Sequence, residues 1–167
     1  MLIVNKINKF ALIISVFIIC FSAWYVHYHR ALMFDFVDEY NNIVAGWFML
    51  QGRELYSEIF FNRQPLPAVI SSIIQFVTTP QSIYEYILHH RILMIAYSII
   101  WTVTLIWRFG IAGMVFSILF EGMRLYLFAF TFQAEGMIAY PIAYMIALVL
   151  YAWQKKTIYV WEYYLMI

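Results

Sequence analysis

Long apolar runs, each bounded by charged or polar residues, divide the chain into candidate membrane helices. A helix needs about 20 mostly apolar residues to cross a hydrocarbon core about 30 Å thick. The first run also resembles a cleaved signal peptide, since Cys20 and Ser22 form a weak small-x-small cleavage site. The remaining chain is itself so apolar that a retained first helix needs no further explanation, so we expect this run to be retained. We predict about four transmembrane helices, at residues 10–26, 88–107, 109–130 and 136–153.

The topology depends on a fifth apolar run, residues 66–79, which has only 14 residues and follows a break at Pro65 and Pro67. Such a short run is typical of an interfacial or re-entrant helix. If it lies on the surface, the basic residues flanking the spans all fall in the cytoplasm; if it crosses, three of them move outside. These residues are Lys6, Lys9, Arg108, Lys155 and Lys156. We therefore expect a multi-pass protein of the plasma (inner) membrane, with a cytoplasmic N-terminus and an external loop over residues 27–87.

This external loop contains the most polar segment of the chain. Residues 35–64 hold both aspartates, three glutamates, two arginines and three asparagines. Apolar residues recur there at the i, i+3, i+4, i+7 and i+8 spacing of one helical face, which predicts an amphipathic helix on the membrane surface. They are Tyr40, Ile43, Val44, Trp47 and Phe48. The predicted fold class is an all-α polytopic membrane protein with amphipathic surface helices in its first external loop.

Composition agrees with this class and excludes others. Apolar residues make up 65% of the chain and charged residues only 11%, whereas about a quarter of a soluble domain is charged. A net charge of +1 provides no basic field for a nucleic-acid backbone, so the lipid bilayer is an expected partner and nucleic acid is not. The chain has no zinc, phosphate-loop or nucleophilic-serine motif, and no metal or other cofactor is supported.

Asp38 and Glu39 stand at the first turn of the amphipathic helix, where unpaired backbone N–H groups and the helix dipole favour negative charge. One interpretation of Asp38 is therefore a helix N-cap. The other is catalytic, because a carboxylate held at the membrane boundary can act as general base towards an acceptor hydroxyl that attacks a lipid-linked sugar. The residues alone leave both interpretations open.

A departing phosphate requires cations, and arginine can hold a phosphate through two parallel hydrogen bonds. Arg63 is one candidate for this contact. Arg124 is another, although it stands three residues after Glu121 on one helical face, where a structural ion pair is the favoured interpretation.

Two further charged residues lie near the predicted membrane boundary. Arg91 follows two histidines and is interpreted as an interfacial anchor. Glu135 lies where the chain turns back towards the cytoplasm, and either flanks a helix start or supplies a second carboxylate on the side of Asp38.

Three segments occur in order along the external loop: Phe36-Val37-Asp38-Glu39-Tyr40, Leu50-Gln51-Gly52-Arg53-Glu54-Leu55-Tyr56 and Asn62-Arg63-Gln64-Pro65-Leu66. Their order and spacing resemble the first external loop of the GT-C glycosyltransferases. They are most similar to RgtA/B/C/D-like members and to the protein mannosyltransferase and lipid A aminoarabinose transferase relatives. Further along, Arg108-Phe109-Gly110 is similar to a basic-aromatic-Gly turn of that family, and Glu135 to the acidic position of its second external loop.

The resemblance implies transfer of a sugar from a polyprenyl-phosphate donor to a lipid, glycan or protein acceptor at the external membrane face. It implies that Asp38 is the catalytic base with Glu39 beside it, and that Arg63 contacts the donor phosphate. Asn62 stands where some relatives have a metal-binding glutamate, so the resemblance implies no metal. Family enzymes are longer, and residues 1–167 are therefore expected to form one membrane module, the N-terminal part of a larger enzyme. This module is expected to be inactive by itself.

The non-enzymatic alternative is a small multi-pass membrane subunit or scaffold in which Asp38 caps a helix and the loop charges are solvated. A transporter fragment is disfavoured, because the polar residues cluster in an external loop and not at broken helices near the bilayer midplane. Asparagine at position 38 separates the first two classes, since it still caps a helix but cannot act as a base.

Overall fold

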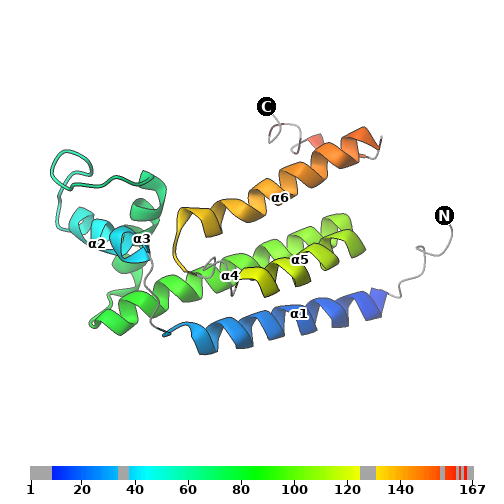
Figure 1. The fold of residues 1–167 in the computed structure, drawn as a ribbon, viewed down its shortest axis with the longest axis horizontal. Helices are drawn as coiled ribbons and strands as arrows, with labels where there is room; N and C mark the ends of the chain where they lie inside the picture. Colours follow the sequence, from blue (N-terminus) through cyan, green and yellow to red (C-terminus); the bar gives the residue numbers. More distant parts are fainter. Residues whose placement is uncertain are drawn as a thin grey trace.

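The computed structural model describes residues 9–33, 38–124, 131–154, 157–160, 162 and 164. These residues form α-helices and no β-strand: α1 (Lys9–Arg30), α2 (Glu39–Leu50), α3 (Pro65–Thr78), α4 (Ile83–Phe109), α5 (Ile111–Arg124) and α6 (Ala134–Trp153). α1, α4, α5 and α6 run alongside one another, while α2 and α3 lie together at one end (Figure 1). The predicted all-helical fold is confirmed for the described residues.

Three helices are long and apolar enough to cross a membrane: Leu12–Arg30, Ile83–Phe109 and Ala134–Trp153. They correspond to the predicted spans at 10–26, 88–107 and 136–153, and are compatible with a multi-pass membrane protein. The fourth predicted span, 109–130, is described only in part: α5 is 14 residues long, and residues 125–130 lie outside the described residues. The short apolar run forms α3, which is also a 14-residue helix.

The direction of the helices decides which segments meet. α1 and α5 run towards the end that carries α2 and α3, whereas α4 and α6 start at that end and run away from it (Figure 1). The end of α1, all of α2 and α3, and the starts of α4 and α6 are therefore gathered at one end of the molecule. The start of α6 carries Glu135, which the sequence predicted to lie on the side of the 27–87 loop.

Local sequence explains where the helices begin and end. α4 begins five residues before the predicted span because Ser82 caps it: the Ser82 hydroxyl accepts the Glu85 backbone N–H at 3.3 Å, and the Glu85 carboxylate accepts the Gln81 N–H at 2.6 Å. The helix ends at Gly110, whose φ of +61° favours glycine. α3 begins with Pro65, which lacks the N–H that a first helical turn leaves unpaired.

α2 and α3 pack closely and are tied to α4 by buried polar side chains. Gln75 of α3 donates to the Ile43 carbonyl of α2 at 2.8 Å. Ser71 of α3 lies 2.7 Å from Nε2 of His90 in α4, whose Nδ1 donates to the Tyr86 carbonyl at 2.6 Å. The His90 Nε2 therefore accepts the Ser71 hydroxyl. These contacts fix the α2–α3 pair on the first turns of α4.

The far end is held by an apolar cluster and an ion pair. Residues of α4 and α6 form the cluster, which contains Leu105, Phe109, Tyr140, Tyr144 and Leu148. After α6, the buried Glu162 carboxylate accepts from Nε and Nη2 of Arg108, at 2.6 and 2.8 Å. The segment that follows α6 is thereby docked on the end of α4.

Candidate functional site

A polar pocket of about 240 Å³ opens at the end of the molecule that carries α2 and α3. It lies where the N-terminus of α2, the residues before α3 and the start of α6 meet. Three of the predicted site residues line it, namely Asp38, Arg63 and Glu135. The rest of its lining is Asn42, Asn62, Gln64, Pro67, Gln133 and Ala134. Two carboxylates and one guanidinium, from segments about 25 and 70 residues apart in the chain, thus share one small cavity.

The Asp38 side chain points to Arg63 and does not cap its helix. Asp38 occupies the N-cap position of α2, but its side chain makes no capping hydrogen bond. Its Oδ2 lies 2.5 Å from Nη2 of Arg63, and the two side chains are 54% and 38% exposed. An ion pair this exposed is worth at most about 1 kcal/mol, so either partner can leave it at little cost. The carboxylate is available for chemistry in a way that a buried cap would not be.

Tyr56 and Gly52 explain why the motif around Arg63 has its spacing. The Tyr56 hydroxyl donates to the Arg63 carbonyl at 2.8 Å, which ties the turn after α2 to the residues before α3. Gly52 has a φ of +82°, a left-handed conformation that glycine adopts without strain. The Gly-x-x-x-Tyr pattern therefore shapes the loop that presents Arg63 to the pocket, although neither Gly52 nor Tyr56 lines it.

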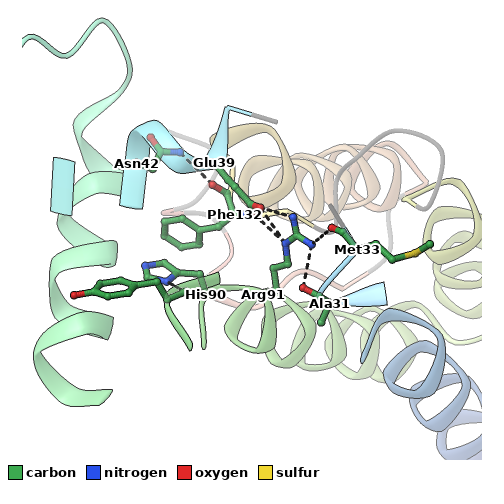
Figure 2. Close-up of polar contacts among 8 residues, drawn as sticks. Ala31, Met33, Glu39, Asn42, His90, Arg91 and Phe132 are labelled. Carbon is green, nitrogen blue, oxygen red and sulfur yellow. Dashed lines mark hydrogen bonds and ion pairs between the residues drawn. The ribbon is translucent and has the colours of Figure 1, made fainter. Parts of the chain in front are cut away.

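Glu39 lies outside the pocket although it follows Asp38 directly. Its side chain is fully buried and forms an ion pair with Arg91 of α4. Nε of Arg91 lies 3.0 and 3.3 Å from the two carboxylate oxygens, and Oε2 also accepts the Phe132 backbone N–H at 3.0 Å (Figure 2). Glu39 is thus held among protein groups, where it cannot contact a substrate.

Arg91 is the principal residue of this region that the sequence did not indicate. It was expected to be an interfacial anchor, but it is only 1% exposed. Asn42 was missed as well: it lines the pocket, and its Nδ2 donates to the Phe132 carbonyl at 3.1 Å. The Phe132 ring lies edge-on to His90, with ring centroids 4.7 Å apart. The sequence gives one sign of the role of Arg91, which is its position inside an apolar helix. A charged side chain there must face protein or water and not lipid.

Arg124 lies in a different cluster from the pocket. Its Nη1 is 3.0 and 3.2 Å from the carboxylate oxygens of Glu121, which confirms the predicted i, i+3 ion pair. The same carboxylate lies 2.8 Å from Nε2 of His27 in α1 and accepts the Tyr140 hydroxyl of α6. This buried cluster connects α1, α5 and α6, and Arg124 does not line the polar pocket.

The pocket is suited to acid–base chemistry on a polar, anionic ligand. Asp38 and Glu135 can accept protons, Arg63 can hold an anion, and Asn42 and Asn62 supply amide donors and acceptors. Among the described residues, no group of three or more His, Cys, Asp or Glu side chains is arranged to hold a metal ion. Comparisons of the chain with protein-family models, with curated proteins and with solved structures give no match.

Proposed function

We propose that this chain is a glycosyltransferase module of the GT-C type, in a plasma membrane, which transfers a sugar from a polyprenyl-phosphate donor to a lipid, glycan or protein acceptor at the external face. The observation that carries the proposal is the Asp38–Arg63 pair. It places a solvent-accessible carboxylate and a guanidinium 2.5 Å apart in a polar pocket that also holds Glu135. A base next to a phosphate-binding cation is what such a transfer requires.

In the proposed reaction, Asp38 accepts the proton of the acceptor hydroxyl as its oxygen forms a bond to the anomeric carbon. The bond between that carbon and the phosphate oxygen breaks, and the polyprenyl phosphate leaves with both bonding electrons. Arg63 stabilises the phosphate, exchanging Asp38 for the donor as its partner. Because the Asp38–Arg63 pair is exposed, this exchange costs little and frees the base only when the donor is bound.

The remaining predicted site residues have no direct role in the proposed bond exchange. Glu135 shares the pocket with Asp38 and places a second carboxylate there. Glu39 is buried and acts through the protein, while Arg124 is engaged with Glu121 away from the pocket. We therefore assign the phosphate contact to Arg63 alone.

The replacement Asp38→Asn tests the proposal. Asparagine keeps the N-cap preference and the exposed ion pair contributes little, so stability should change by less than about 1 kcal/mol. Loss of the base should lower transfer from a polyprenyl-phosphate sugar by about 10²-fold or more, measured in membranes that contain the enzyme to which this module belongs. Full transfer by the folded variant contradicts the proposal, whereas loss of folding favours the scaffold alternative.

Glu58→Gln is the matched control for this change. Glu58 is an exposed carboxylate in the same loop, outside the polar pocket, and its Oε2 accepts the Glu54 backbone N–H at 2.8 Å. Glutamine preserves an acceptor oxygen there, so this variant should transfer sugar at the rate of the unchanged protein. Equal losses in both variants would mean that loop charge in general, and not a base at position 38, supports the reaction.

A further inference from the structure

Arg91 is a buried cation at a point where four segments of the chain meet (Figure 2). Its Nη1 donates to the carbonyls of Ala31 and Met33, just after α1, at 3.0 and 2.9 Å. Its Nε and Nη2 donate to the carboxylate of Glu39, the first residue of α2. That carboxylate in turn accepts the Phe132 N–H. Arg91 thus joins α4 to the end of α1, to the start of α2 and, through Glu39, to the segment that leads into α6.

The segments joined in this way carry two walls of the polar pocket. Asp38 immediately precedes Glu39, and Glu135 follows Phe132 by three residues. Both backbone polar groups of Phe132 are bound by α2, since its N–H donates to the Glu39 carboxylate and its carbonyl accepts from Asn42 Nδ2. The separation of the two carboxylates across the pocket therefore depends on these contacts between α2 and the approach to α6.

The chemistry of the ion pair favours a role in geometry over a role in stability. Desolvating two charges offsets most of their attraction, so a buried pair is a weak source of stability. A guanidinium is nevertheless planar, and its donors have fixed directions. Arg91 directs them at four acceptor atoms on two segments, the carboxylate oxygens of Glu39 and the carbonyls of Ala31 and Met33. Lysine carries the same charge but cannot reproduce this fork.

We propose that Arg91 is a positioning residue: with Glu39 and the Phe132 backbone, it fixes the distance between the Asp38 and Glu135 walls of the pocket. It touches no substrate and acts through Glu39. Its importance for sugar transfer rests on the proposed function, whereas its effect on the geometry of the pocket does not.

Spin-label distances measure that geometry directly. Labels are attached through the substitutions Asn41→Cys on α2 and Ile138→Cys on α6, both at exposed positions, in a Cys20→Ser background. The distance distribution is recorded by double electron–electron resonance on the full chain in lipid, well below its unfolding temperature. Arg91→Lys should broaden or shift this distribution, because α2 and the start of α6 lose their common anchor. A residue that contributes only to stability would lower the unfolding temperature and leave the distribution unchanged.

Arg108→Lys is the matched control, since it removes the same kind of two-nitrogen contact, to Glu162, at the opposite end of α4. It should leave the Asn41–Ile138 distance distribution unchanged. An unchanged distribution in folded Arg91→Lys, or an equal change in both variants, overturns the proposal. If Arg91→Lys does not fold, Glu39→Gln is measured in the same way, and an unchanged distribution there also overturns it.

Sugar transfer provides a second, separable measurement. A displacement of about 1 Å at a reacting centre lowers turnover by about 10²-fold, so Arg91→Lys should lower kcat by up to this factor with little change in KM for the donor. A changed distance distribution without any transferase activity in the enzyme to which this module belongs would contradict the proposed function and leave the positioning role standing. A normal kcat together with a changed distribution would refute the importance of this geometry for catalysis.

Discussion

Gly46 provides the sharpest test of how the site is built, because it marks the closest approach of α2 to α3. A Cβ atom at this position would lie 2.6 Å from Ser71 Oγ, 2.7 Å from Ser71 Cβ and 2.8 Å from the Ser72 backbone nitrogen. Non-bonded carbon contacts are most favourable at about 3.5–4.0 Å, so Gly46→Ala requires α2 and α3 to separate by roughly 1 Å. Ser71 cannot rotate away freely, since its hydroxyl is bound to His90 at 2.7 Å.

Two opposing effects set the magnitude of this change. Overpacking costs about 1–3 kcal/mol, and the contact with a backbone atom of Ser72 puts Gly46→Ala at the upper end of that range. Replacing a helical glycine by alanine stabilises the helix by up to about 1 kcal/mol. The net destabilisation should be about 2 kcal/mol. Asp38 is carried by α2 and Arg63 precedes α3, so the same displacement should separate their side chains and lower transfer by up to about 10²-fold.

Gly122→Ala is the control, because Gly122 is also helical but a Cβ there has no neighbour within 4 Å. This variant should gain a few tenths to about 1 kcal/mol from helix propensity alone. Unfolding of both variants is followed by far-ultraviolet circular dichroism in detergent, against heat or denaturant. If Gly46→Ala is as stable as Gly122→Ala and transfers sugar normally, the close contact of α2 with α3 does not hold the site.

Three further predictions concern other contacts. Tyr56→Phe removes the hydrogen bond to the Arg63 carbonyl and should lower the free energy of unfolding by no more than about 1 kcal/mol. The variant should nevertheless raise KM for the donor, and an unchanged KM contradicts this. Glu121→Ala removes the carboxylate paired with the buried Arg124 and should lower the free energy of unfolding by about 3–5 kcal/mol; a loss under 1 kcal/mol in the same unfolding assay would refute a structural role for the pair. Burial disfavours ionisation of Glu162, but hydrogen bonds from Arg108, the Tyr159 backbone and Tyr144 outweigh it and lower its pKa from 4.5 to about 2. The stabilisation is complete above pH 4.5 and is lost as the pH falls through about 2, so the Tyr159 amide should stay protected from hydrogen exchange at pH 4, and exchange there would contradict the assignment.

The helices were largely predictable because their signals are local. Apolar length predicted α1, α4 and α6, and the i, i+3, i+4 spacing predicted α2. The placement of Glu135 beside Asp38 followed from the count of crossings and the positions of basic residues, and the two residues do line one pocket. Each of these inferences required only the period of a pattern or the number of times the chain turns back.

The part of the site that escaped prediction depends on contacts between distant residues. Glu39 meets Arg91 across 52 positions, and Phe132 meets Glu39 across 93, separations that carry no periodic signal. One aspect was nevertheless accessible. Successive residues of an α-helix project about 100° apart, so Asp38 and Glu39, at the first turn of α2, point in different directions. Treating the Asp-Glu pair as two neighbouring site carboxylates overlooked this geometry.

The two acids of that pair form opposite kinds of ion pair, and the difference shows how one dipeptide can combine the proposed chemistry with a structural role. Asp38 and Arg63 are 54% and 38% exposed, so their contact is weak and can be exchanged for a ligand. Glu39 and Arg91 are 0% and 1% exposed, and removing either charge would leave the other buried, at a cost of about 3–5 kcal/mol. A single helix turn therefore places an exchangeable carboxylate in the pocket and, one residue later, anchors its own backbone to α4. Exchanging the two residues, Asp38→Glu with Glu39→Asp, should lower the free energy of unfolding, because the shorter aspartate side chain cannot span the same contacts to Arg91 and the Phe132 backbone. Unfolding of this variant at the same denaturant concentration as the unchanged protein would contradict the anchoring role of Glu39.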